Sequence, residues 1–483
     1  MELKFPSFPL IFVSLTFIFL MLKLFSNFRG FRRTKLPPGP WKLPLIGSLH
    51  HLAVAGLEPH HVLANLATKY GPIMHLQLGE ISAVIISAPR VAKEVLKTHD
   101  LAFASRPKLL APEIITYNCA DIVFAPYGGY WRQMRKICTL ELLTAKNVRS
   151  FSSIREEEAL NLFESIQSSL FSPIDLTQKI FTYTNNVVSR AAFGNRSKNQ
   201  EKVIRLIKEL TANAGGFDVA DLYPSVKILQ VISGLKSKLV ELRNKTDQVL
   251  NDIIDEHKER LANKEKFNGQ SGEEDLVDAL LRHKETRYVN CWIRYFSNNS
   301  RIRYVRNDET PKSVGILRGK DRIRVTDLER LSYLKMVLKE TLRLHPPLPL
   351  LLPRICREPK EIDGYDIPIN TRVILNAFAI NRDPEYWEDA ESFKPERFAN
   401  SGIEFIGPNF EFLPFGGGRR ICPGISFGLA NAEFLLAQLL YHFNWKLPDR
   451  MKLEDLDMTE ILGTVVRKKN KLYLVPTSYS YST

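Results

Sequence analysis

Apolar residues recur at helical spacing along most of this chain, and runs typical of strands are short and few. Between residues 129 and 281 the pattern is mostly that of amphipathic helices, with polar breaks near residue 197 and over residues 262–275. Four short stretches predict strands, at residues 73–78, 83–87, 361–367 and 372–377. The pattern therefore predicts a mainly α fold with a small β subdomain.

Two helices are predicted in the C-terminal half from their start signals. The tetrapeptide Thr-Asp-Leu-Glu at 326–329 has the spacing of a capping box, and it predicts a helix that runs to Leu344. Pro423 is a favoured first helical residue, and it predicts a second helix that runs to about His442. Cys422 would then lie at or next to the N-cap of this second helix.

The N-terminal residues predict a membrane anchor. The apolar run at 5–22 is near the lower length limit for crossing a bilayer. Basic residues follow it over 28–35 without a small-residue cleavage site, so we expect an uncleaved, single-pass anchor that leaves the rest of the chain on the cytosolic side. On this basis the chain divides into a membrane anchor (1–25), a basic and proline-rich hinge (26–47) and one main domain (48–480).

Composition narrows the functional classes. The five cysteines lack paired spacing, which argues against a disulfide scaffold and against a zinc module. The net charge of +14 would suit nucleic acid, anionic lipid or an acidic protein partner. Residues 284–325 hold eleven lysines and arginines against four acidic residues, so this tract alone supplies half of the net charge.

The stretch FGGGRRICPG at 415–424 places one cysteine between a glycine-rich loop and a long apolar helix. Consecutive glycines let a flat group approach the backbone. A helix N-terminus beside Arg419 and Arg420 favours the thiolate form of Cys422, and arginine side chains bind carboxylates. Together these features are typical of an axial haem ligand. For this segment alone, a phosphate-binding loop or a cysteine used only in packing are the alternatives.

Two further pairs of side chains, Glu340 with Arg343 and Trp131 with Arg135, lie at helical spacing elsewhere in the chain. Glu340 and Arg343 lie at i and i+3 of a predicted helix, which in isolation would be a solvated surface pair. Arg397 offers a third charge downstream, and a glutamate shared by two arginines predicts a buried network that fixes the loop before the cysteine. Trp131 and Arg135 lie one helical turn apart, so that both could hydrogen-bond the same carboxylate.

Four motifs stand in order along the chain: Trp131-x-x-x-Arg135, Glu340-x-x-Arg343, the Pro-Glu-Arg-Phe segment at 395–398 and the loop at 415–424. Together they resemble those of the cytochrome P-450 family of haem-thiolate monooxygenases. The proline hinge and the Asn-Arg-Asp-Pro step at 381–384 are similar to the plant microsomal clan, many of whose members hydroxylate terpenoids, alkaloids and phenolics. The resemblance covers about residues 1–283 and 326–478, and it implies a cytochrome P-450 fold preceded by an N-terminal transmembrane anchor.

The resemblance also implies a role for individual residues. Cys422 would be the axial ligand of haem (iron protoporphyrin IX), whose thiolate favours O–O cleavage. The contacts to the haem propionates would come from Trp131, Arg135, Arg354 and Arg420. The structural network would consist of Glu340, Arg343 and Arg397. Segments 111–125, 348–352 and 461–465 would contribute to the substrate pocket.

The activity implied by the resemblance is the NADPH- and O2-dependent hydroxylation of a small hydrophobic metabolite. Electrons would come from an NADPH-dependent flavoprotein reductase, an acidic partner steered by a basic surface around the cysteine. Both proteins would be held by lipid in the endoplasmic reticulum membrane, with the catalytic domain on the cytosolic side. No nucleic-acid partner is expected.

One part of the family pattern is missing from residues 284–325. The family carries a long distal helix with an Ala/Gly-Gly-x-Asp/Glu-Thr motif that relays protons to bound dioxygen, and this tract contains no such motif. It is also too basic for a buried helix. The only acid–alcohol step is Glu309-Thr310, which Pro311 follows, and proline disfavours helix at the residue before it.

Three explanations of this tract remain open: a translated intron or frameshift in the gene model, which we favour, a decayed gene, and a specialised insertion. An inactive haem-binding or misfolded remnant that lacks the proton-relay helix is therefore the main alternative function. A third is a basic interaction module formed by residues 284–325, whose aromatic residues could stack on bases.

Overall fold

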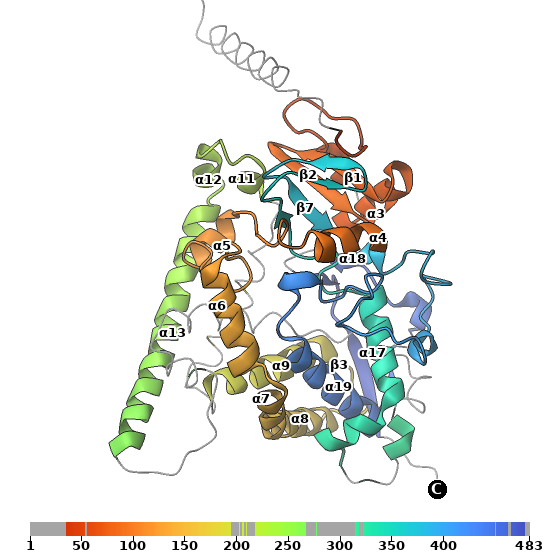
Figure 1. Ribbon diagram of the computed structural model, residues 1–483. Coiled ribbons are helices and arrows are strands. Elements are labelled where there is room, and N and C mark those ends of the chain that lie inside the picture. The colour runs from red at the N-terminus through yellow and green to blue at the C-terminus, as the bar shows by residue number, and fades with distance from the viewer. Residues whose placement is uncertain are drawn as a thin grey trace, which may run out of the picture.

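The computed structural model describes residues 35–53, 56–194, 202, 205–206, 209, 218–266, 277, 314–317, 320, 322–449, 451–461 and 465–478. Helices dominate this part of the chain; the largest group of strands lies at one end of the molecule, and a smaller sheet that contains β3 lies near the other end, as Figure 1 shows.

The α-helices are α2 (Leu49–Leu52), α3 (Pro59–Tyr70), α4 (Pro89–Lys93), α5 (Leu110–Ile115), α6 (Gly129–Ile137), α7 (Ala145–Ser150), α8 (Ser152–Gln167), α9 (Leu176–Phe193), α11 (Val219–Leu222), α12 (Ile228–Ile232), α13 (Leu235–Lys266), α17 (Ser332–Leu344), α18 (Ala377–Ile380) and α19 (Ile425–His442). The π-helical turns are η1 (Glu94–Thr98) and η2 (Cys138–Leu142), and the 3₁₀ turns are η4 (Gly315–Leu317), η5 (Val325–Arg330), η6 (Pro395–Phe398), η7 (Gly418–Arg420) and η8 (Leu453–Asp455). The strands are β1 (Ile73–Leu78), β2 (Ile81–Ile86), β3 (Ile174–Asp175), β4 (Arg354–Ile355), β5 (Lys360–Ile362), β6 (Tyr365–Ile367), β7 (Arg372–Leu375), β8 (Phe443–Lys446), β9 (Glu460–Ile461), β10 (Arg467–Lys468) and β11 (Tyr473–Ser478).

The largest sheet has the strand order β1-β2-β7-β4 and is buried on both faces. Strands β1 and β2 form an antiparallel hairpin, and β2 pairs in parallel with β7, so that Ala83 is opposite Arg372 and Ile86 is opposite Leu375. Alternate residues of these strands enter two different cores, as the period of two requires. One face packs on α3, and the other packs on α4 and η1.

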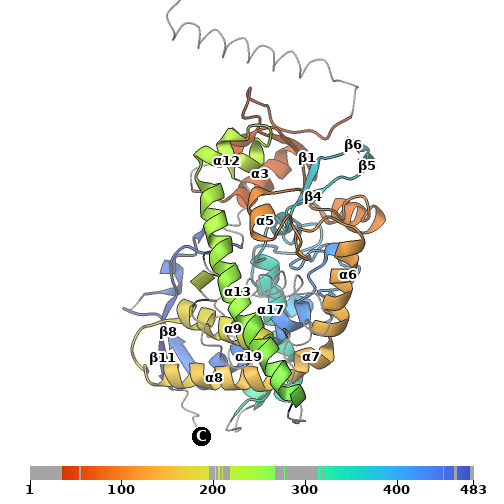
Figure 2. The ribbon, with the colours of Figure 1, turned by 90° about the vertical axis from the view of Figure 1, so that its left-hand side faces the viewer.

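A larger helical core lies away from this sheet and is built around α19. Helix α8 packs against α9 and α19, α17 packs against α19, and all four helices contribute residues to one hydrophobic core; the view in Figure 2 shows α8 and α9 beside α19. Most residues of α9 and α19 are buried, and for α19 this explains why the helix is apolar over most of its circumference. This packing holds α19, the helix that follows Cys422, in place.

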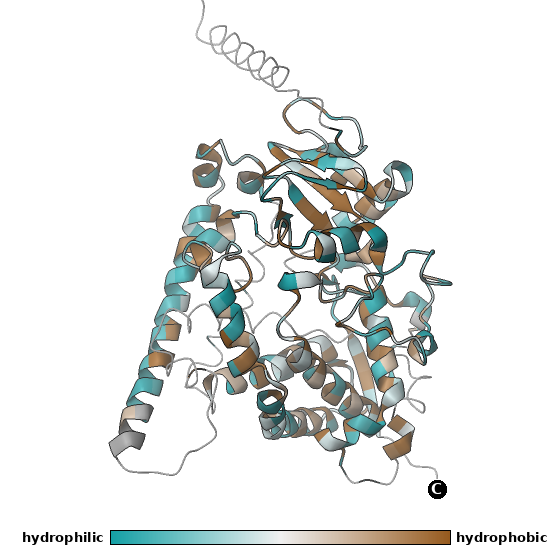
Figure 3. Ribbon diagram, viewed as in Figure 1, coloured by the Kyte–Doolittle hydropathy of each residue, from teal (hydrophilic) through white to brown (hydrophobic). Residues whose placement is uncertain are grey.

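Helix α13 is long and mostly polar, and it crosses one side of the molecule (Figures 2 and 3). Its buried residues recur at helical spacing, from Leu239 and Leu242 to Leu250 and Ile254, and form a single apolar stripe. The helix continues to Lys266, so the polar break that we predicted to begin at residue 262 begins later. The first residues of that stretch are good helix formers, and polarity alone does not end a helix.

Both start signals in the C-terminal half predicted the wrong first residue. The tetrapeptide at 326–329 lies in η5, where Asp327 accepts a hydrogen bond of 2.9 Å from the backbone N of Arg324, and α17 begins only at Ser332. The N-cap of α19 is Gly424, so Cys422 lies two residues before the N-cap. In both cases a tight turn satisfies the local backbone and delays the helix. The predicted ends, at Leu344 and His442, are confirmed.

Part of the proline-rich hinge packs directly on the sheet. The backbone N of His75 in β1 donates to the carbonyl of Pro38 at 2.8 Å. A Cβ at Gly39 would lie 2.0 Å from the carbonyl oxygen of His75, so only glycine fits there. Within the described residues no helix is long and apolar enough to cross a membrane. The predicted span at 5–22 lies outside those residues.

Most of the basic tract at 284–325, including Glu309 and Thr310, also lies outside the described residues. Its last residues are part of the helical core. Leu317 and Ile323 are buried, and their backbone carbonyls accept hydrogen bonds from Tyr441 and Gln438 of α19, at 3.1 and 2.9 Å. The chain therefore rejoins the core before residue 325.

Candidate functional site

The glycine-rich loop before α19 is held by close backbone packing. Gly416 and Gly418 have φ angles of 71° and 64°, in the left-handed region that favours glycine. A Cβ at Gly418 would lie 2.4 Å from the carbonyl oxygen of Leu96 and 2.7 Å from Oδ1 of Asp100. Oδ2 of Asp100 accepts a hydrogen bond of 2.8 Å from the backbone N of Arg419. The loop therefore requires glycine at position 418, and Asp100 supports it.

Cys422 follows this loop directly and is half-buried. Its backbone N donates to the carbonyl of Phe415 at 3.1 Å, which closes the loop. From α6, Arg135 donates through Nη1 to the carbonyl of Ile421 at 2.6 Å. These two hydrogen bonds fix the backbone on the N-terminal side of the sulfur.

Arg420 is a buried charge near the loop. Its guanidinium is buried and lies 4.2 Å from the centre of the Trp131 ring, whose Nε1 donates to the carbonyl of Ile122 at 2.9 Å. In the described part of the chain, its hydrogen bonds go only to the backbone carbonyls of Ala104, Ile122 and Ala125. Burial, with Arg354 and Arg135 nearby, lowers the pKa of Arg420 to about 9. This position therefore favours a negatively charged ligand.

Arg354, in β4, approaches the same loop from the sheet. Its Nη2 donates to the carbonyl of Gly417 at 2.7 Å, and its Nη1 lies 3.3 Å from Oδ1 of Asp100. Burial lowers the pKa of Arg354, and Asp100 partly offsets this effect. Trp131, Arg135, Arg354 and Arg420 thus gather around the residues that precede Cys422.

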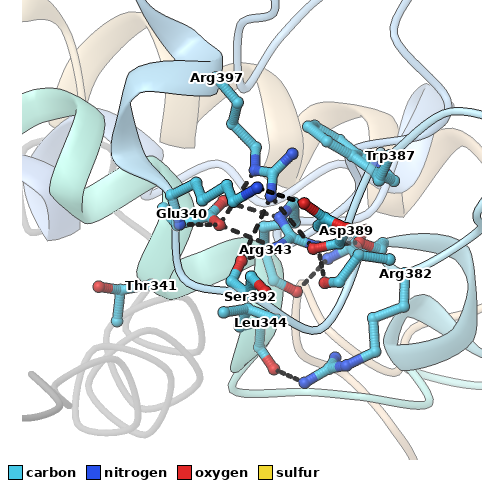
Figure 4. Close-up of polar contacts among 12 residues, drawn as sticks. Glu340, Thr341, Arg343, Leu344, Arg382, Trp387, Asp389, Ser392 and Arg397 are labelled. Carbon is cyan, nitrogen blue, oxygen red and sulfur yellow. Dashed lines mark hydrogen bonds and ion pairs between the residues drawn. The ribbon is translucent and has the colours of Figure 1, made fainter.

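The structure brings Glu340, Arg343 and Arg397 into one network (Figure 4). Arg343 donates two hydrogen bonds to the Glu340 carboxylate, from Nε at 2.7 Å and from Nη2 at 2.8 Å. The Nε of Arg397 donates to the same carboxylate at 3.1 Å, and so does the backbone N of Lys394 at 2.8 Å. The carboxylate therefore accepts four hydrogen bonds, which compensates the burial of its charge.

This network extends to the loop through Asn381, the first residue of the Asn-Arg-Asp-Pro step, and it also contacts Trp387. Arg343 donates to the carbonyl of Asn381 at 3.0 Å, and Oδ1 of Asn381 accepts from the backbone N of Leu413 at 3.0 Å. The ring of Trp387 lies within 5.1 Å of the Arg343 guanidinium and 5.8 Å of the Arg397 guanidinium. We did not predict Asp100 or Trp387 from the sequence, because neither belongs to a local motif.

Three segments were predicted to line the substrate pocket, and in the structure two of them accept hydrogen bonds from buried arginines. Segment 111–125 provides two of the carbonyls that bind Arg420, and segment 348–352 is tied to Arg106, whose Nη1 donates to the carbonyl of Leu352 at 2.6 Å. In segment 461–465, Ile461 lies in β9, and residues 462–464 lie outside the described residues. The pocket itself remains a prediction.

Comparisons of this chain with protein families and with characterised proteins agree on one family. The family model "Cytochrome P450" matches residues 37–292 and 313–475. Premnaspirodiene oxygenase from Hyoscyamus muticus is 52% identical over 509 residues, covering 99% of this chain and 100% of that protein. The 5-epiaristolochene 1,3-dihydroxylase of Nicotiana tabacum is 49% identical, with the same 99% and 100% coverage. Germacrene A hydroxylase of Barnadesia spinosa is 47% identical, covering 96% of each chain.

The fold has similar solved structures as well. A zebrafish cytochrome P450 solved with progesterone has a TM-score of 0.71 and 23% identity, covering 87% of this chain and all of that one. At this identity the similarity concerns the fold alone, and it confirms the predicted helix-rich fold with small sheets.

The family model leaves part of the basic tract at 284–325 unmatched. It matches up to residue 292 and again from residue 313. Leu317 and Ile323, near the C-terminal end of the tract, are buried. The alignment with the Hyoscyamus protein is longer, at 509 positions, than the 483 residues of this chain. That relative therefore contains residues that this chain lacks.

Proposed function

Because the chain belongs to the cytochrome P450 family, it is a haem-thiolate monooxygenase by descent, and we propose that it hydroxylates a small, apolar, terpenoid-like metabolite. The relatives named for premnaspirodiene, 5-epiaristolochene and germacrene A support this substrate class. The aliphatic segments 111–125 and 348–352 suit such a molecule.

The residues around the loop fit the haem of this family. A haem presents two carboxylates at one edge, and the buried Arg420, whose hydrogen bonds within the described residues go to backbone carbonyls, is suited to bind one of them. This is the observation that carries the proposal. Arg135, Arg354 and the indole N–H of Trp131 would complete the contacts to the carboxylates, and the Cys422 thiolate would be the axial ligand.

When bound, the haem supplies the iron at which dioxygen is activated with electrons that originate from NADPH. The chain's own residues orient the group and shield it. Arg135 fixes the backbone before Cys422, Asp100 holds the loop, and the network of Glu340, Arg343 and Arg397 anchors the segment that leads into the loop.

The remaining parts of the proposal concern the membrane and the electron donor. A flavoprotein reductase on the endoplasmic reticulum membrane would deliver electrons to the side of the chain that carries Cys422. The apolar run at 5–22 would hold the protein, through a single span, on the same membrane. Arg419 is half-exposed beside Cys422 and would contribute positive charge to the surface that meets this acidic partner.

A second candidate function is a haem-binding protein without turnover. It is favoured by the stretch 293–312, which the family model leaves unmatched, and by the shorter length of this chain relative to the Hyoscyamus protein. Such a chain would hold haem through Cys422 and the arginines but would lack residues that deliver protons to dioxygen.

Two measurements separate these candidates. The full chain, purified with haem, is reduced and exposed to carbon monoxide; thiolate ligation gives the red-shifted Soret band after which the family is named. We expect the band in the unaltered chain and in Cys356→Ser, a matched buried cysteine, and its loss in Cys422→Ser. A chain without the band would overturn both candidates.

If the band is present, the chain is reconstituted with a plant NADPH-dependent reductase and supplied with premnaspirodiene or germacrene A. Oxygenated product formed in step with NADPH consumption supports the monooxygenase. NADPH consumption without product on a panel of terpene hydrocarbons would leave the haem-binding protein as the function.

A further inference from the structure

A second cluster of metal-binding side chains lies outside the haem region. His60 and His61 occupy the first turn of α3, and Glu460 begins β9, four hundred positions later in the sequence. The Nε2 atom of His60 lies 3.1 Å from Oε2 of Glu460, and the Nε2 atom of His61 lies 3.9 Å from the same oxygen. All three ligand atoms lie within 4.8 Å of one another.

The convergence of these two histidines is unusual for their positions. Neighbouring residues on a helix point in directions about 100° apart, and their side chains do not normally meet. Here the two rings lie 4.3 Å apart, and both contact the ring of Phe378 in α18 at 5.0 and 4.4 Å. The aromatic contacts hold both imidazoles toward the carboxylate before any ligand is bound, which lowers the cost of binding one.

A single hydrogen bond does not account for this arrangement. Of the two histidines, only His60 is within hydrogen-bond distance of Glu460, whereas His61 is turned toward the same oxygen from beyond that distance. An ion with bonds of about 2.0–2.2 Å to nitrogen and oxygen would bring all three atoms into direct contact with it, and the cluster needs to contract by only about 1 Å to allow this.

We propose that His60, His61 and Glu460 bind a divalent ion of the zinc class. Two imidazole nitrogens and one carboxylate form a donor set that zinc uses in proteins with the fourth position open to water. The exposure of the three side chains, 1%, 36% and 16%, leaves the site open on the side of His61. Arg382, the nearby cation, is paired with Glu391 at 3.2 Å.

The bound ion would join the two ends of the catalytic domain. The carbonyl of His60 accepts a hydrogen bond of 3.1 Å from Asn376, the N-cap of α18, so α3 is already tied to the middle of the chain. The ion adds a tie from α3 to β9, the strand that also carries Ile461. It is therefore a structural brace for the hairpin of β9 and β10, separate from the haem and its arginines.

The test uses the untagged, haem-loaded full chain, stripped of loose metal with a chelator and titrated with zinc chloride by calorimetry. We expect one zinc per chain and a zinc-dependent rise in the temperature of unfolding. Glu460→Gln keeps the size of the side chain and its hydrogen bond but removes the anionic ligand, and it should weaken zinc binding at least tenfold.

His61→Gln should weaken binding to a similar extent, and because its side chain is half-exposed the variant should fold normally. His51→Gln is the matched control, since the rings of His50 and His51 are also adjacent, with centroids 3.9 Å apart, but contact Trp41 and form no metal-binding group with a carboxylate within the described residues. Unchanged zinc affinity in both Glu460→Gln and His61→Gln, or no saturable binding in the unaltered chain, would overturn the site.

Discussion

Arg343 and Glu340, one turn apart on α17, form a two-pronged ion pair in which neither side chain is accessible to solvent. An exposed pair at this spacing would contribute only a few tenths of a kcal/mol. Because this carboxylate also binds Arg397, two guanidinium groups share its one negative charge.

Removal of that charge should therefore be costly. In Glu340→Gln, two arginines lose their shared counter-ion inside the protein, and we expect a loss of about 3–5 kcal/mol in the free energy of unfolding. Urea unfolding of the purified, haem-loaded chain measures this. Glu404→Gln is the control, because Glu404 pairs with Lys339 at 2.7 Å at the surface and its loss should cost less than about 1 kcal/mol. Equal effects of the two substitutions would contradict the buried network.

The loop before Cys422 should not tolerate a side chain at Gly418. Gly418→Ala combines a left-handed backbone with a Cβ placed 2.4 Å from the Leu96 carbonyl oxygen, so the loop must shift. Gly402→Ala has nearly the same φ, 65°, with nothing near the added carbon, and should cost only about 1 kcal/mol of backbone strain. We expect Gly418→Ala, but not Gly402→Ala, to lower the haem content of the purified protein severalfold. Full haem content in Gly418→Ala would show that the loop can move freely.

Trp131 should help to retain the haem through its indole N–H and through its ring contact with Arg420. Trp131→Phe removes the N–H that donates to Ile122 and weakens the ring contact with Arg420, so Arg420 becomes less well oriented. Transfer of haem to an excess of apomyoglobin should become about tenfold faster. Trp41→Phe alters an exposed ring in the hinge and should leave the transfer rate unchanged. Identical rates in the two variants would separate Trp131 from haem binding.

Because of His75, which contacts Lys42 in the hinge, the free energy of unfolding should fall at acidic pH. Burial, with Lys42 nearby, lowers the pKa of His75 to about 4, and its ring contacts Lys42 Nζ at 3.2 Å and Ser82 Oγ at 3.0 Å. The folded protein keeps this imidazole neutral, whereas the unfolded chain protonates it below about pH 6.5. Stability should therefore fall between pH 6.5 and 4, by at most about 3 kcal/mol.

Replacing His75 with a side chain that does not titrate isolates its contribution to the pH dependence of stability. Over the same pH range, His75→Gln should lose less of its free energy of unfolding than the unaltered chain loses, although it starts from a lower value at pH 7. The slope of stability against pH, measured by urea unfolding, is the comparison. Parallel slopes would assign the acid sensitivity to other groups.

The spacing of residues in the sequence correctly predicted features that lie within a single helix or strand. Strand β1 matches its predicted range, and the pairs on α6 and α17 lie on shared helix faces because three or four residues separate them. The start signals failed where a turn competed with the helix: Asp327 satisfies Arg324 in a 3₁₀ turn instead of capping α17.

Long-range support could not be predicted in this way. Asp100 reaches Arg354 and Arg419 across more than two hundred and fifty positions, and Trp387 stacks on arginines from two other segments. Neither residue has a spacing that marks it, since these contacts exist only after the sheet and the helical core have come together. The same holds for the histidines of α3 and their carboxylate in β9.

The parallel pairing of β2 with β7 has a consequence for synthesis of the chain. The hairpin of β1 and β2 leaves the ribosome early, but its partner strand begins only at Arg372. At about 5–20 residues per second, translation leaves the edge of β2 without its neighbour for tens of seconds. That edge is rich in isoleucine and valine, the composition that aggregates most readily as exposed strands. Slower initiation of translation, or co-expression of chaperones that bind nascent chains, should therefore raise the soluble yield of this protein. The gain should exceed that from a lower growth temperature, because slower elongation prolongs the exposure of β2.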